Sequence, residues 1–155
     1  MKKIPMFLLM IAPCAFTWLF FHSGPSAALI LSYLSILLLN ILYPLSLPQL
    51  NFSGQRLLFW DMLLKLWNIP LYLAIFLFAF FGMVLAIPAI PFWFLFDYTL
   101  LLATSAYGIV GIVKSRQSGL LSTKAAILHI FLHFLFCFDV FSAIYCFIKA
   151  RRKSA

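Results

Sequence analysis

Glutamate is absent from this 155-residue sequence, and its three acidic residues are all aspartate: Asp61, Asp97 and Asp139. Charged residues of either sign make up only 9% of the chain, whereas about a quarter of the residues in a soluble domain are charged. So little charge cannot cover a globule in water, which excludes an ordinary soluble domain. The residues that are present agree, because 66% of them are hydrophobic and the mean hydropathy is +1.12. The sequence therefore predicts an integral membrane protein.

The short motifs that carry common enzyme chemistry are also missing. The sequence contains no HExxH metalloprotease motif, no GxSxG nucleophile motif and no glycine-rich phosphate loop. Cys137 and Cys146 would lie about 13 Å apart on one expected helix, which is too far for a disulfide. We therefore predict that the protein is not an enzyme, has no catalytic residues and uses no cofactor.

Five apolar runs are long enough to cross a bilayer, which takes about 20 helical residues. We expect one all-α membrane domain over residues 1–155, a polytopic bundle of five spans, with four spans as the alternative. Trp60 and Trp67 are typical of the headgroup level, so the segment around them is predicted as a short interfacial helix that ends before Pro70. The predicted spans are residues 4–21, 26–47, 69–86, 92–113 and 125–148, and the interfacial helix is residues 57–68.

The basic residues predict how the chain is threaded. With the N-terminus inside, seven Lys and Arg residues lie on the cytoplasmic side and four lie outside, and the reverse orientation inverts this count. The positive-inside rule therefore favours a cytoplasmic N-terminus. The tail "KARRK", residues 149–153, conflicts with five spans, because a short basic tail prefers the cytoplasm. The conflict disappears if the first or the fifth run does not fully cross.

Polar residues inside the predicted fifth span form a candidate buried network. His129 and His133 are four residues apart on one helix face, but Cys137 is about 12 Å from His129, so a metal would need ligands from another helix, and none is expected. Asp139 and Asp97 would reach similar depths on neighbouring helices and share a proton, because two adjacent carboxylates do not both ionise cheaply. Such a pair is either a structural link or the basis of proton-coupled transport. The predicted network is Asp97, Asp139, His129 and His133.

Two further patterns occur on the predicted third and fourth segments. Asp61 and Lys65 have the i,i+4 spacing of an ion pair and are predicted to neutralise each other at the interface. Thr104, Gly108 and Gly111 share one helix face, which is typical of close helix packing. The alternative for this stripe is the wall of a solute path.

Two segments resemble a known group of proteins. "WDMLLKLWNIPLY", Trp60–Tyr72, and "HFLFCFDVFSAI", His133–Ile144, resemble an uncharacterised family of small polytopic membrane proteins of Gram-positive anaerobic bacteria. The likeness depends on Lys65, on the following Ile-Pro pair and on the Phe-Cys-Phe-Asp core of the second segment. It implies a bacterial plasma membrane, and it carries no activity.

The sequence predicts a multi-pass protein of the bacterial plasma membrane that contacts the lipid bilayer. Its basic residues are expected to set topology and contact anionic headgroups, and nucleic acid is not expected as a partner. We predict a non-enzymatic accessory, regulatory or immunity-type protein that binds a membrane-protein partner or a second copy of itself. The alternative is a small transporter or channel that uses Asp97, Asp139 and the histidines.

Overall fold

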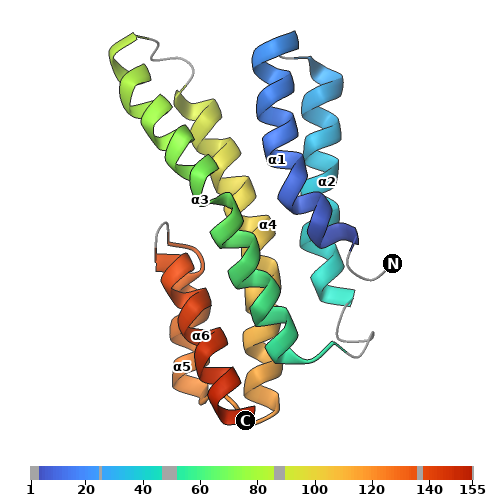
Figure 1. Cartoon of the computed structure of the whole chain (residues 1–155), viewed down its shortest axis with the longest axis vertical. Coiled ribbons are helices and arrows are strands. Elements are labelled where there is room, and N and C mark those ends of the chain that lie inside the picture. Colours follow the sequence, from blue (N-terminus) through green and yellow to red (C-terminus); the bar gives the residue numbers. More distant parts are fainter. Residues whose placement is uncertain (1–3, 25, 47–51, 86–89, 136–137, 155) are drawn as a thin grey trace.

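The structure, a computed structural model, describes residues 4–24, 26–46, 52–85, 90–135 and 138–154, with only the backbone described for 78, 79, 82–85, 90 and 154. All regular structure in these ranges is helical, as expected (Figure 1). The elements are α1 (Ile4–Ser23), α2 (Ala27–Ser46), α3 (Gly54–Leu85), α4 (Ile90–Gln117), α5 (Thr123–Leu132) and α6 (Phe138–Ser154).

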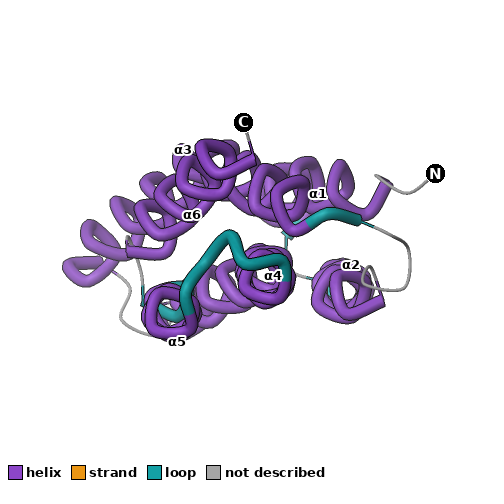
Figure 2. Tube along the Cα trace, turned by 90° about the horizontal axis from the view of Figure 1, so that it is seen from below, coloured by secondary structure: helices purple, strands orange, loops and turns teal. Residues whose placement is uncertain are grey.

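The helices form three antiparallel pairs that lie side by side. Viewed end-on, α1, α3 and α6 make one layer and α2, α4 and α5 the other, so that α3 and α4 are central (Figure 2). The tight turn between α1 and α2 contains Gly24 with φ of 77°, a left-handed conformation that favours glycine. The hydroxyls of Ser32 and Ser35 donate to carbonyls of their own helix, which satisfies them on an apolar surface.

The prediction of a separate interfacial helix over residues 57–68 is wrong. Helix α3 is continuous for 32 residues and contains Pro70 in its interior. Proline removes one backbone donor, but neighbouring helices and local polar groups make this tolerable inside a membrane bundle. Beside it, the Asn68 side chain donates to the Leu64 carbonyl at 2.8 Å. The long partner helix α4 packs along α3 and supports it as one element.

The predicted fifth span, residues 125–148, is also wrong as a single helix. Helix α5 ends at Leu132 and α6 begins at Phe138, and α6 runs back beside α5 (Figure 1). The His129 ring stacks on the Tyr145 ring with centroids 4.9 Å apart, which fixes the antiparallel pairing. With 10 and 17 residues, these helices are shorter than the roughly 20 residues a crossing takes. We call this pair the C-terminal hairpin.

Four helical segments in the described ranges are long and apolar enough to cross a membrane. They are Ile4–Ser23, Ala27–Ser46, Gly54–Leu77 and Pro91–Gln117. This number agrees with the four-span alternative and does not support five spans.

The core has an aromatic part and a part built from smaller residues. Phe16, Tyr33 and Phe96 stack mutually with centroids 4.4 to 5.1 Å apart, which joins α1, α2 and α4. At the other side, small and aliphatic side chains attach the C-terminal hairpin to α3 and α4. These residues are Leu58, Ile112, Leu121, Ala126, Cys146 and Ala150.

Candidate functional site

Four ionisable side chains meet where the C-terminal hairpin contacts α3. Asp61 and Lys65 come from α3, His133 is the C-cap of α5, and Asp139 lies in the first turn of α6. None of the four is more than 1% exposed. Buried charges are costly unless they are paired and hydrogen-bonded, so their partners decide what the site can do. We call Asp61, Lys65, His133 and Asp139 the ionic cluster.

Lys65 is the cation that connects the two carboxylates. Its Nζ lies 3.3 Å from Oδ1 of Asp61 and 3.5 Å from Oδ2 of Asp139, and it donates to the Asp139 carbonyl at 3.4 Å. The second oxygen of Asp61 lies 3.0 Å from Nε2 of His133. With both carboxylates ionised and His133 neutral, the cluster has one more negative than positive charge. A proton or one small monovalent cation would neutralise it.

Hydroxyl groups hold the two histidines in place. Ser142 Oγ lies 3.1 Å from Nδ1 of His133 and 2.9 Å from Nδ1 of His129. The Ser105 hydroxyl on α4 donates to the His133 carbonyl at 2.8 Å. Carbonyls at the end of a helix lack intrahelical partners, so this bond satisfies the backbone where α5 stops. The break between α5 and α6 is therefore built into the site.

Glycine on α4 lets the cluster approach that helix closely. A Cβ on Gly108 would overlap the His133 ring and lie 2.6 Å from Oδ2 of Asp61. One turn further on, a Cβ on Gly111 would lie 3.1 Å from the Leu58 backbone nitrogen. Thr104 is fully buried and donates to carbonyls of its own helix at 3.0 and 3.1 Å. The stripe of Thr104, Gly108 and Gly111 therefore faces the centre of the bundle.

The structure combines two groups of residues that the sequence analysis kept apart. The predicted ion pair of Asp61 and Lys65 is present at 3.3 Å with both side chains 0% exposed inside the protein, and its position at the membrane interface stays a prediction. Asp139 was paired with Asp97, whereas its nearest charged partner here is Lys65. The depth comparison behind that pairing assumed an unbroken helix over residues 125–148, so the break changes its outcome.

Asp97 lies on α4 outside the ionic cluster. It is 7% exposed, and its Oδ1 has no hydrogen-bond partner in the described part of the chain. Asp97 is therefore a buried carboxyl group on α4 that makes no ion pair with the described residues of the cluster.

Sequence reasoning missed Ser105 and Ser142. A single serine in an apolar helix gives no periodic signal, and Ser105 lies next to Thr104 rather than on its stripe. The position of Ser142, three residues after Asp139, was the available signal, because residues three apart lie on one helix face.

The fold and this cluster define the chain as an all-helical protein with four membrane-competent helices and an ionic centre. The chain belongs to the family of unknown function DUF6652, whose model matches residues 62–152. The match includes most of α3, all of α4 and α5, and nearly all of α6, and therefore Lys65, His133 and Asp139. No curated protein and no solved structure matches the chain.

Proposed function

We propose that this protein is a small cation–proton exchanger of the bacterial plasma membrane, with the ionic cluster as its binding site. The observation that carries the proposal is the position of Lys65 between two buried carboxylates at a break between helices. Ionisable groups inside a bilayer are expensive and typically mark ion paths or proton relays. Interrupted helices at membrane depth form the binding sites of many transporters.

The cluster supports exchange because one site serves two ligands. A proton on Asp139 removes its charge and weakens the attraction to the Lys65 ammonium at 3.5 Å. A small cation neutralises the same carboxylate, so proton and cation compete. Asp139 lies in the first turn of α6, and His133 is the C-cap of α5, so a change in this charge balance acts directly on the C-terminal hairpin. Movement of this hairpin against α3 would then alternate access to the site.

Proteoliposomes with a trapped pH dye test this function. An imposed gradient of Na⁺, K⁺, Li⁺ or Mg²⁺ should change the internal pH for the wild type. Asp139→Asn should abolish the change while the protein stays folded, because the amide oxygen still accepts from the Val140 N–H, now bonded at 2.7 Å. Ser35→Ala, on the exposed face of α2, is the control and should retain exchange. Wild-type liposomes that respond to none of the four cations would contradict the proposal.

A groove between α1 and α3 favours a second function, binding of a membrane-protein partner. Its volume is about 540 Å³, and Trp18, Phe21, Leu71 and Ala74 contribute to its walls. Small grooves between apolar helices suit a further transmembrane helix, since association in lipid depends on close packing. Mild detergent extraction should then recover a stoichiometric membrane partner that Ala74→Trp releases. Recovery of the same lone chain from both variants would exclude this function.

A further inference from the structure

Lys and Arg residues are concentrated at the helix ends that form one end of the molecule, the lower end in Figure 1. This end is formed by the starts of α3 and α5 and by the ends of α4 and α6. The three aspartates of the chain lie elsewhere, because Asp61 and Asp139 belong to the ionic cluster and Asp97 lies near the start of α4, and the sequence has no glutamate. The basic residues at this end are Arg56, Lys114, Arg116, Lys124, Lys149, Arg151, Arg152 and Lys153.

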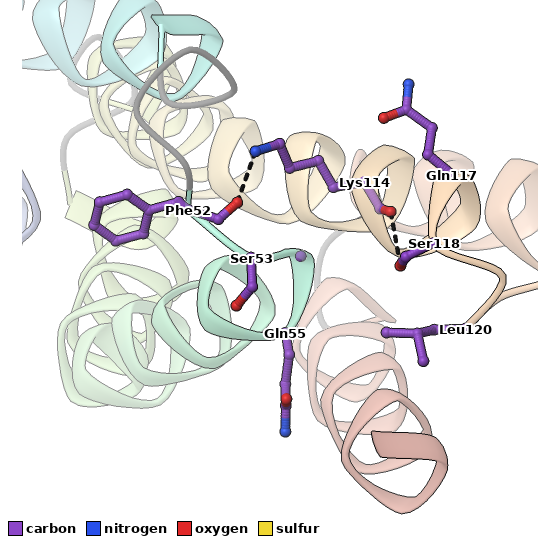
Figure 3. Close-up of a pocket in the computed structure, with 8 residues that line it drawn as sticks. Phe52, Ser53, Gln55, Lys114, Gln117, Ser118 and Leu120 are labelled. Carbon is purple, nitrogen blue, oxygen red and sulfur yellow. Dashed lines mark hydrogen bonds between the residues drawn. The ribbon is translucent and has the colours of Figure 1, made fainter.

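A pocket opens at this end between the start of α3 and the end of α4 (Figure 3). Its volume is about 600 Å³. Lys114 lines the pocket, and its Nζ donates to the Phe52 carbonyl at 2.6 Å, which holds the cation along the wall. Ser53, Gln55 and Gln117 add neutral polar groups to the lining, and the Ser118 hydroxyl donates to the Lys114 carbonyl at 3.0 Å. The lining thus combines a cation with polar groups and has no carboxylate.

We propose that this pocket binds the phosphate of an anionic phospholipid headgroup. Phosphate is recognised by a positive charge together with hydrogen-bond donors, and lysine supplies that charge as a point cation. The pocket lies at the ends of α3 and α4, the level at which headgroups meet membrane-spanning helices. Leu120 gives it an apolar side chain for the glycerol and the start of an acyl chain, whereas the Phe52 ring packs in the core.

The surrounding basic residues fit the same ligand. Arg56 and Arg116 are exposed on the two helices that form the pocket. Arg56 lies two residues after Gly54, and Arg116 lies two residues after Lys114. Juxtamembrane basic clusters attract anionic lipid, and the pocket provides one defined binding site among these basic residues. This inference is independent of the exchange function, because it uses none of the cluster residues.

Thermal unfolding of the purified full-length chain in detergent tests the site. Phosphatidylglycerol should raise the Tm of the wild type, and phosphatidylcholine should not. Lys114→Gln should weaken the apparent affinity for phosphatidylglycerol about tenfold, the loss expected for one charged contact. Arg152→Gln removes the same charge at the same end but outside the pocket, and should keep near wild-type affinity.

Several outcomes would overturn the proposal. Equal weakening by both variants would mean attraction to general surface charge. An equal effect of phosphatidylcholine would mean simple solvation by lipid. Stabilisation by inorganic phosphate alone, at the same concentration, would make the ligand free phosphate rather than a lipid. If Lys114→Gln fails to fold, Gln117→Glu, which places a carboxylate in the pocket, should abolish the lipid effect.

Discussion

At the scale of single residues, Lys65 supplies the positive charge that offsets the two buried carboxylates of Asp61 and Asp139. It contacts Asp61 of its own helix and Asp139 of the C-terminal hairpin, and all three side chains are almost fully buried. A buried ion pair adds little stability over an apolar pair of similar size, but loss of one partner leaves an uncompensated charge. The contribution of Lys65 is therefore best measured by removing it alone and then together with one carboxylate.

Lys65→Gln should destabilise the protein by about 3–5 kcal/mol, because Asp61 and Asp139 lose their shared cation. Chemical unfolding in detergent, monitored by tryptophan fluorescence, measures this change. The exposed Lys153→Gln is the matched control, since it removes the same charge without a buried partner. Adding Asp139→Asn to Lys65→Gln should recover part of the loss. Similar stability of Lys65→Gln and Lys153→Gln would contradict the role assigned to Lys65.

At the scale of helices, the C-terminal hairpin is the element that could not be predicted from the sequence. The long apolar helices α1, α2 and α4 could be predicted, because a run of about 20 apolar residues in lipid forms a helix that satisfies its own backbone hydrogen bonds. The break after α5 could not, since the segment from Leu132 to Phe138 contains neither Gly nor Pro. Its cause is tertiary: Ser105 binds the His133 carbonyl, and Lys65 binds Asp139.

In the candidate site, too, the contact within one helix could be predicted from the sequence, and the contact between helices could not. The spacing of Asp61 and Lys65 on one helix predicted their contact, because both positions depend on helical geometry alone. The contact between Lys65 and Asp139 joins residues 74 positions apart, and no local pattern encodes it. The continuous helix α3 was missed for a related reason: Pro70 normally favours a break, and the packing of α3 against its neighbouring helices supports it as one element.

Ser105→Ala tests the tertiary origin of the hairpin. Without the hydroxyl, the buried carbonyl of His133 loses its donor, which should cost about 1–2 kcal/mol. Hydrogen exchange in peptides from α5 and the start of α6 should become roughly tenfold faster, while exchange in α2 should not change. Ser32→Ala is the control, because that hydroxyl bonds only within its own exposed helix surface. Equal exchange in the two variants would show that the hairpin does not depend on Ser105.

At the scale of the whole molecule, the hairpin resolves the conflict over the basic tail. A fifth crossing would have carried residues 149–153 to the side opposite the basic loop that follows α4. Because α6 returns beside α5, the tail instead ends near the start of α3 and the end of α4, where Ala150 packs with Leu58 and Ile112. All described Lys and Arg residues outside the ionic cluster then lie at one end, which is the pattern that the positive-inside rule expects of a cytoplasmic face.

Cysteine labelling in intact cells tests this threading. In a variant with Cys14, Cys137 and Cys146 replaced by serine, single cysteines at Ser26, Ser118 and Ser154 are exposed to a membrane-impermeant maleimide. Ser26→Cys, in the turn between α1 and α2, should be labelled from outside. Ser118→Cys and Ser154→Cys should react only after permeabilisation, because both lie at the basic end. Labelling of Ser154→Cys from outside, with Ser118→Cys protected, would mean that the C-terminal hairpin opens into a crossing helix in the membrane. The ionic cluster would then be taken apart, since its contacts require α6 to lie back against α3.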